Sequence, residues 1–381
     1  MHSYRAITWD HPRGYNALAA AALDPGRGQL AISWDRQSLE GFESHSIKDL
    51  CARYDLVVLD HPHVGEAVRD HCLRPLETVF RPEVAIGLGN TTIGPCFASY
   101  CFASKHWALP LDAAAQVIAA RTDLLSGPLP ETWDDVAALS RATSNGVAMS
   151  LAGPHALLTF LSIATAFGEP PATRDPDFLV SNETGMRVFE LMADLVSRSP
   201  KSVREMNPIG ILSHMAEWND VVLCPLVYGY VNYASPERAR PLRFFNAPRA
   251  TIGGRPGSTL GGTGIGISTR CKVSDELLQH LLWLMSGEAQ THFIPAHDGQ
   301  PSLRSAWGDP GLNRDWGDFY LNTAETLEAA YVRPRHAGYI QFQGAASALL
   351  RDAFSQGIPA AALLDELQLL YYASRVNGGE R

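Results

Sequence analysis

Short apolar segments alternate with helical patterns in the first part of the chain. Strands are predicted at residues 4–9, 29–34 and 55–60, and helices at residues 16–23 and 46–53. The third strand has an entirely apolar interior, which is typical of a strand buried on both faces of a sheet. Strands that alternate with helices predict an α/β fold in which helices cover a parallel sheet.

The middle of the chain predicts a strand with a single acidic residue, Asp112, followed by a helix that begins after Thr132. Thr132 and Asp135 have the Thr-x-x-Asp spacing of a capping box, which satisfies free backbone N–H groups at a helix start. The remaining predictions are strands at 146–151, 221–227 and 265–268, helices at 154–167 and 185–199, a helix capped by Ser274, and a helical C-terminal third with Pro359 at a first helical position.

Aromatic and polar residues follow each of the first three predicted strands. These clusters are Trp9-Asp10-His11, Trp34-Asp35-Arg36 and Asp60-His61-Pro62-His63. Because ligands of parallel α/β sheets bind at the carboxyl ends of the strands, these clusters are candidate ligand contacts. The same residues also fit structural roles, in which Trp9 and Trp34 pack at an edge of the core and Asp35 and Asp60 cap the next segment.

Two patterns suggest a metal or a cofactor, and neither is complete. His61 and His63 would present both rings on one face of an extended segment, but no third ligand follows at a standard spacing. The glycine-rich run from Gly262 to Gly266 lacks the G-x-G-x-x-G spacing of a dinucleotide site. The sequence therefore predicts no cofactor and no metal.

Composition excludes some classes of partner and leaves the compartment open. The 381 residues allow two or three domains, and a net charge of −9 argues against a nucleic-acid partner. None of the six cysteines forms a C-x-x-C pair; most fit small buried hydrophobes, whereas Cys96 and Cys101 are close enough in sequence to bridge in an oxidising compartment. We expect neither a transmembrane helix nor a secretory signal peptide, because the pattern passes from Met1 directly into the strand at residues 4–9.

The order of several short motifs resembles one family. These motifs are the strand Asp55–Asp60, Asp123-Leu124-Leu125, Pro130-Glu131-Thr132-Trp133-Asp134-Asp135, Gly261–Ile267 and Met285–Gln290. Each motif is weak alone, but together they resemble the extracytoplasmic solute-binding proteins of ABC transporters, in the carbohydrate-binding, maltose-binding-protein-like branch. The resemblance implies a two-lobed type II periplasmic-binding-protein-like fold, with lobe 1 at 1–107 plus 252–300, lobe 2 at 108–251 plus 301–381, and hinge crossover strands between them.

The resemblance also implies roles for particular residues. Arg13, Asp60, His61 and Asp112 match positions of polar ligand contacts, and His155 and the Tyr228-Gly229-Tyr230 turn match positions of aromatic ones. The turn also fits a purely structural role, since glycine permits the bend. The matched positions and the strand-end clusters together give the expected ligand-binding set, which is Trp9, Asp10, His11, Arg13, Asp35, Asp60, His61, His63, Asp112, His155, Tyr228, Tyr230 and Gly262.

The function implied by the resemblance is capture of a small polar, sugar-like solute between the lobes of a monomer, with hinge closure and delivery to a membrane ABC permease in the periplasm. A set rich in histidine and poor in tryptophan also suits a smaller or anionic ligand. Two alternatives stay open. The first is an enzyme that uses His61 or His155 as a base with Asp60 or Asp112 as its partner. The second is a cytoplasmic ligand sensor, which the expected lack of a signal peptide suggests.

Overall fold

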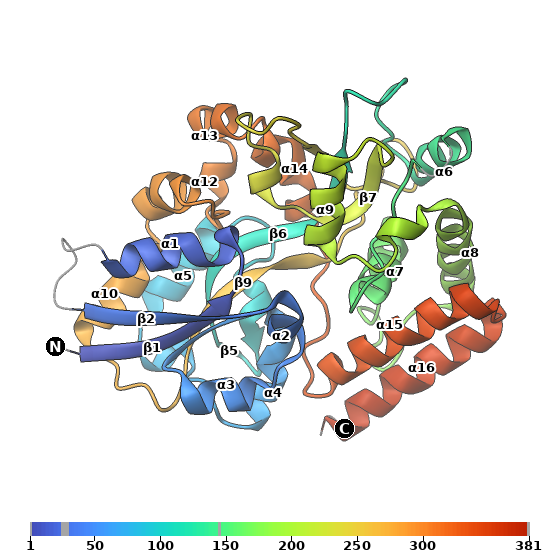
Figure 1. Ribbon diagram of the computed structural model, residues 1–381. Helices are drawn as coiled ribbons and strands as arrows, with labels where there is room; N and C mark the ends of the chain where they lie inside the picture. The colour runs from blue at the N-terminus through green and yellow to red at the C-terminus, as the bar shows by residue number, and fades with distance from the viewer. Residues whose placement is uncertain (1, 24–29, 144–145, 379–381) are drawn as a thin grey trace. The chain divides into compact units, whose positions relative to one another are not determined.

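The chain forms two compact units in the computed structural model, which describes residues 2–23, 30–143 and 146–378 (Figure 1). Unit 1 comprises residues 1–114, 261–314 and 335–337, and unit 2 comprises residues 115–260, 315–334 and 338–381. Two strands, β6 (Leu109–Ala120) and β9 (Leu260–Ile267), each contain a point at which the chain passes from one unit to the other. The boundaries expected from the sequence lay at 107/108, 251/252 and 300/301.

Unit 1 is built on a mixed sheet. β1 (His2–Trp9) pairs in parallel with β2 (Leu30–Gln37) and with β3 (Leu56–Leu59), whereas β3 pairs antiparallel with β9. The prediction of a parallel sheet is therefore right for β1 to β3 and wrong at β9, the strand on which the chain re-enters this unit. The helices of unit 1 include α1 (Pro12–Leu23), α2 (Leu39–Ser44), α3 (Ile47–Arg53), α4 (Val64–Arg69), α5 (Pro82–Thr91), α10 (Asp275–Leu284) and α12 (Arg304–Trp307).

The core of unit 1 lies where α3 and α4 cover β3. All four residues of β3 are buried, as the apolar sequence of this strand predicted. Leu50 and Cys51 of α3, Val64 of α4 and Leu59 of β3 belong to one cluster of buried side chains. This packing fixes the turn that follows β3, which carries several of the candidate site residues.

Unit 2 surrounds a second set of strands with longer helices. β6 is buried along its whole length and pairs antiparallel with β7 (Leu223–Tyr228) and β8 (Arg243–Phe245). The helices of unit 2 include α6 (Trp133–Ala142), α7 (His155–Ala166), α8 (Asn182–Arg198), α9 (Pro208–Glu217), α14 (Phe319–Glu328), α15 (Tyr339–Gln356) and α16 (Ala360–Asn377).

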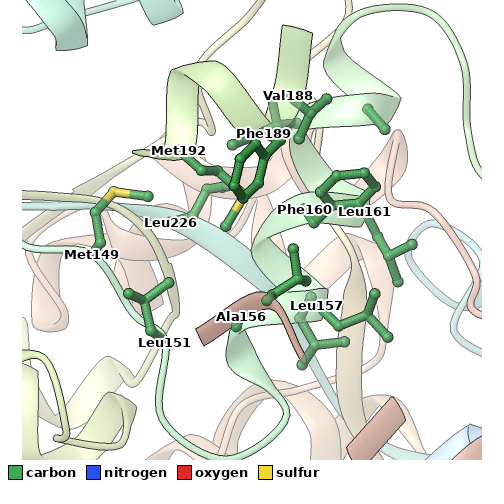
Figure 2. Packing of buried hydrophobic residues seen from close by; sticks show 14 of the residues in the cluster. Met149, Leu151, Ala156, Leu157, Phe160, Leu161, Val188, Phe189, Met192 and Leu226 are labelled. Carbon is green, nitrogen blue, oxygen red and sulfur yellow. The ribbon is translucent and has the colours of Figure 1, made fainter. Parts of the chain in front are cut away.

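Helix α7 forms the centre of the unit 2 core. Every one of its residues is buried, and it packs against α8 and α15. Figure 2 shows Phe160 of α7 on the side of Val188, Phe189 and Met192 of α8. The continuous apolar pattern of α7 reflects its position inside the unit. Among the described residues, no helix combines the length and apolarity needed to cross a membrane.

The capping box at the start of α6 is confirmed. The Thr132 hydroxyl accepts a hydrogen bond from the Asp135 N–H at 3.2 Å, and the Asp135 carboxylate accepts from the Thr132 N–H at 2.9 Å. These bonds hold the pKa of Asp135 below its usual value, with the Thr132 hydroxyl as the largest cause.

Thr132→Ala is expected to lower the free energy of unfolding of unit 2 by about 1 kcal/mol, because the helix loses a side-chain acceptor at its first turn. Thr132→Ser keeps the hydroxyl and is the matched control, expected to stay within about 0.5 kcal/mol of the wild type. Urea unfolding followed by circular dichroism measures both variants. Equal losses in the two variants would contradict a capping role.

Three sequence predictions of local structure need correction. Residues 146–151 form no strand; only Val147 makes an isolated bridge, to Leu223. β2 continues through Trp34-Asp35-Arg36 rather than ending there, because its pairing with β1 extends to Gln37. Pro359 is the N-cap of α16, one position before its first residue. Residue 29 of the predicted strand 29–34 lies outside the described residues.

Candidate functional site

The most buried polar contact among the candidate residues of unit 1 joins Arg13 to Asp112. Arg13 lies in α1 and Asp112 in β6, and both side chains are more than nine-tenths buried. Arg13 Nε donates to Asp112 Oδ2 at 2.9 Å, and Arg13 Nη2 donates to Oδ1 at 2.5 Å. This bidentate geometry is the strongest form of an arginine–carboxylate pair. The sequence indicated each residue as a ligand contact, and the structure shows that each also holds the other in place.

An aromatic stack lies next to this ion pair. Trp9 ends β1, and its ring stacks on His11 with centroids 5.2 Å apart and planes 6° apart. The Arg13 guanidinium carbon lies 5.5 Å from the centre of the Trp9 ring, within the range of a cation–π contact. Trp9 is only 3% exposed, which fits the packing role given as its alternative, and His11 is half-buried.

Gly262 lies against the backbone of Asp112. It has φ = +89°, and a Cβ atom at this position would lie 2.3 Å from the Asp112 carbonyl oxygen and 3.0 Å from Ala113 Cα. Both conditions exclude a side chain. In this unit Gly262 therefore lets the backbone of β9 approach the segment of β6 that carries Asp112.

The turn after β3 places Asp60 and His61 in direct contact. The Asp60 carboxylate caps the turn by accepting from the His61 N–H at 2.8 Å, and His61 Nδ1 lies 3.0 Å from Asp60 Oδ1. His61 and His63 are both buried in a 3₁₀ turn, not in the extended segment on which the histidine pair was argued. In the part of the chain that the structure describes, no three or more histidine, cysteine, aspartate or glutamate side chains gather as metal ligands.

Asp10 and Asp35 lie on the surface of unit 1 in ion pairs with arginines. Asp10 lies 3.0 Å from Arg36, and Asp35 lies 3.1 Å from Arg5. The Tyr54 hydroxyl, followed by Arg5, holds the pKa of Asp35 below its usual value. The strand-end argument for Asp35 fails because Asp35 lies inside β2, opposite Ile7 of β1.

The aromatic candidates of unit 2 lie at the end of β7 and the start of α7. The Tyr228 hydroxyl lies 3.3 Å from Thr259 Oγ1 and donates to the Leu260 carbonyl at 3.3 Å. The buried His155 ring meets the Tyr228 ring edge-on, with centroids 5.9 Å apart. Tyr230 is buried and begins the short turn at Val231–Tyr233. Of the three, only Tyr228 is part-exposed.

Sequence reasoning missed a buried polar network that holds Tyr228. Gln116 Oε1 accepts from Ser162 Oγ at 2.7 Å and from Thr259 Oγ1 at 3.0 Å, and Thr259 in turn contacts Tyr228. All three members are buried, and Gln116 Nε2 has no hydrogen-bond partner within the described residues. No local signal marks these residues, because positions 116, 162 and 259 meet only in the folded unit.

A second missed pair is Arg333 with Gln343. Both side chains are buried in unit 2, and Arg333 Nη1 donates to Gln343 Oε1 at 2.9 Å. Arg333 Nη2 also donates to the Leu260 carbonyl at 3.3 Å, the same carbonyl that accepts from Tyr228. The Arg333-Pro334 dipeptide was visible in the sequence, but nothing near it indicated a buried guanidinium.

Comparison with known proteins gives a fold and no sequence family. No family model matches the chain, and no curated protein matches it. An ABC transporter solute-binding protein from Agrobacterium radiobacter K84, solved in complex with ribitol, is 18% identical with a TM-score of 0.81, covering 97% of this chain and 98% of its own. Maltose-bound MalE3 of T. maritima is 16% identical with a TM-score of 0.80, covering 97% and 98%.

A third neighbour is an ABC transporter solute-binding protein from Thermotoga lettingae, solved with α-D-tagatose. It is 15% identical with a TM-score of 0.80 and covers 98% of this chain and 100% of its own. The chain therefore has the two-lobed α/β fold of the MalE-like solute-binding proteins, as the order of the sequence motifs predicted.

Proposed function

We propose that this protein is a solute-binding protein that captures a sugar or a polyol for import by an ABC transporter. The observation that carries the proposal is the extent of the fold match, which spans 97% or more of the chain with each of the three neighbours described. Those neighbours were solved with ribitol, maltose and tagatose, all of which are small polyhydroxylated molecules.

The chemistry of the candidate residues supports a hydroxyl-rich ligand. Such ligands offer hydroxyl groups, which suit charged planar side chains, and C–H faces, which suit aromatic rings. Unit 1 supplies Arg13 and Asp112 in a fixed orientation, and unit 2 supplies the part-exposed ring of Tyr228. We propose ligand contacts from these three residues together with His61 and His155.

The other candidates divide into three groups. We propose that Trp9, His11, His63, Tyr230 and Gly262 shape the surroundings of the ligand contacts, because they pack against them or fix their backbone. Asp60 orients His61 through its cap. We propose that Asp10 and Asp35 act in ion pairs on the surface of unit 1 rather than in ligand contacts, since arginines already pair with their carboxylates.

One observation favours an enzyme as the second candidate. His61 Nδ1 lies 3.0 Å from the Asp60 carboxylate, the kind of contact that orients a catalytic histidine. The other proposed partner, Asp112, has both carboxylate oxygens engaged by Arg13. We propose binding without covalent chemistry, because the Asp60–His61 contact is between adjacent residues and accompanies a turn cap.

The partner and the compartment follow from the same proposal. A solute-binding protein of this fold delivers its ligand to a membrane permease, so we propose an extracytoplasmic monomer that docks on an ABC permease. The net charge of −9 argues against a nucleic-acid partner.

A ligand screen tests the proposed function. The purified protein is unfolded, dialysed and refolded to remove any carried ligand, and its melting temperature is measured with ribitol, mannitol, tagatose, maltose and sugar acids. A ligand at about 100 times its dissociation constant adds about 2.7 kcal/mol of stability. A hit recovered unchanged by mass spectrometry supports the proposal. A chemically altered hit would establish the enzyme instead, and no hit would contradict a sugar or polyol ligand.

Removing the Tyr228 ring is expected to weaken binding of the ligand found in this screen by about tenfold, equivalent to about 1.4 kcal/mol, because an aromatic face against the sugar is lost. Tyr228→Phe keeps the ring and removes the hydroxyl that bonds Leu260, so its affinity should stay within about threefold of the wild type. Calorimetric titration of Tyr228→Ala and Tyr228→Phe compares them. Equal losses would assign the effect to the hydroxyl rather than to the ring.

A further inference from the structure

Unit 2 contains a cavity of about 530 Å³ with a lining drawn entirely from its own residues. Three segments form this lining: the loop before α7, the end of α8 with the residues that follow it, and the last turns of α15. The candidate ligand contacts named above are all described by the structure, and none of them belongs to the lining. Ligand pockets of proteins have volumes of about 300 to 1,000 Å³, so this cavity has room for a small molecule.

Arg351 of α15 lines this cavity and is held in place by backbone carbonyls. Its Nη1 donates to the Leu151 carbonyl at 3.1 Å and to the Gly153 carbonyl at 2.5 Å, both in the loop before α7. Within the described residues, Nε and Nη2 of Arg351 form no hydrogen bond, and the guanidinium forms no ion pair. Burial lowers the pKa of Arg351, and the nearby Asp352 only partly opposes this effect. The guanidinium is therefore partly dehydrated and has no carboxylate to pair with.

Arg204 belongs to the same lining and is anchored in a similar way. Its Nε donates to the Ser199 carbonyl at 3.1 Å, and its Nη2 donates to the Val196 carbonyl at 2.7 Å, at the end of α8. In the part of the chain that the structure describes, Nη1 of Arg204 has no acceptor and no carboxylate pairs with this arginine. The cavity is thus lined by two arginines that the backbone orients and that keep unused donors.

The other lining residues decide what kind of anion fits beside these arginines. Leu151 and Val196 are buried, and the half-buried Phe354 ring is stacked on a phenylalanine of α8 with centroids 5.2 Å apart. These side chains suit a ligand with an apolar body rather than a bare inorganic ion. Glu205 and Asp352 are exposed members of the lining, and their negative charges disfavour a multiply charged anion. A single carboxylate group therefore fits the site better than a phosphate.

We propose that this cavity binds a small organic carboxylate, with its carboxylate group on Arg351 and Arg204 and its apolar body against Phe354. Arginine and carboxylate form charge-assisted bonds in a planar, bidentate arrangement. The ligand supplies the ion pair that the described residues do not provide for either guanidinium. The inference goes beyond the proposed capture of a sugar or polyol and does not depend on it, since none of these residues is a proposed sugar contact.

Ligand-observed NMR titration of the refolded full chain tests the proposal. The probes are benzoate, phenylacetate and hexanoate, each compared with its neutral amide at constant ionic strength. We expect saturable binding of at least one carboxylate, about tenfold tighter than binding of its amide, because only the charged group forms charge-assisted bonds with arginine. The proposal is overturned if no carboxylate binds saturably, or if each amide binds as tightly as its acid.

Two matched variants assign the binding to the cavity. Arg351→Met keeps an apolar stem and removes the charge, and it should weaken carboxylate binding by about tenfold. Arg141→Met removes the charge of an exposed arginine of α6 outside the lining, and its affinity should stay within about twofold of the wild type. Equal effects of the two substitutions would overturn the proposal, and so would full carboxylate affinity in Arg351→Met.

A third variant keeps the test decisive if Arg351→Met fails to fold. Asp352→Asn keeps the shape of an exposed side chain and removes a negative charge from the lining, so carboxylate affinity should rise by about twofold and amide affinity should not change. An unchanged carboxylate affinity would overturn the proposal.

Titration of Arg351→Met with the sugar or polyol found in the ligand screen separates this inference from the proposed function. We expect unchanged sugar affinity in a variant that has lost carboxylate binding. Loss of both ligands would assign the carboxylate to the sugar site and overturn the inference. A sugar screen without a hit, together with carboxylate binding that depends on Arg351, would contradict the proposed function alone.

Discussion

Asp112→Ala is expected to lower the free energy of unfolding of unit 1 by about 3–5 kcal/mol. The substitution leaves the Arg13 guanidinium buried without the carboxylate that accepts from Nε and Nη2. A buried charge without its partner costs far more than the pair contributes, because its lost hydration is no longer offset. Urea unfolding of the full chain, followed by circular dichroism, measures the loss.

Two controls separate burial from simple loss of charge. Asp10→Ala breaks the exposed ion pair to Arg36 and should cost no more than about 1 kcal/mol. The double variant Arg13→Met/Asp112→Leu removes both charges and should recover most of the stability lost in Asp112→Ala. If Asp112→Ala costs no more than Asp10→Ala, the Arg13–Asp112 pair is not the buried contact described here.

Gly262→Ala is expected to lower the free energy of unfolding by about 3–5 kcal/mol, from two additive causes. The residue has φ = +89°, which an alanine adopts only with strain, and the new Cβ would lie 2.3 Å from the Asp112 carbonyl oxygen. Because that neighbour is backbone in a buried strand, no side chain can turn aside to make room. The same urea unfolding experiment measures the variant.

Gly253→Ala is the matched control for the collision. Gly253 also has a positive φ, +74°, but a Cβ atom there meets nothing within 4 Å. Only the backbone strain should appear, at about 1 kcal/mol. Equal effects at Gly253 and Gly262 would show that β9 does not approach Asp112 as closely as described.

The sequence predicted those parts of the fold whose signals are local. The cap at Thr132 and the helix start at Ser274 are both confirmed, because each depends on side chains that bond backbone groups three residues away. Residues 146–151 have the composition of a strand, yet their pairing with the neighbouring backbone is limited to one isolated bridge, between Val147 and Leu223. Whether an apolar segment becomes a strand depends on a neighbouring backbone, which the sequence does not reveal.

The candidate site was harder to predict because its contacts join distant positions. Arg13 and Asp112 were each proposed from the sequence, but their pairing across 99 positions appears only in the fold. Gly262 was in the predicted set, but its φ and its contact with the backbone of Asp112 appear only in the fold. Gln116, Ser162 and Thr259 were missed entirely, since each is unremarkable until the three meet.

Calorimetric titration of the refolded protein with ribitol, mannitol, tagatose and maltose tests the central claim most directly. The account predicts saturable, one-to-one binding of at least one of these ligands, with the ligand recovered chemically unchanged. No saturable heat from any of them, in a sample that still unfolds cooperatively, would contradict the assignment of this protein as a sugar- or polyol-binding protein.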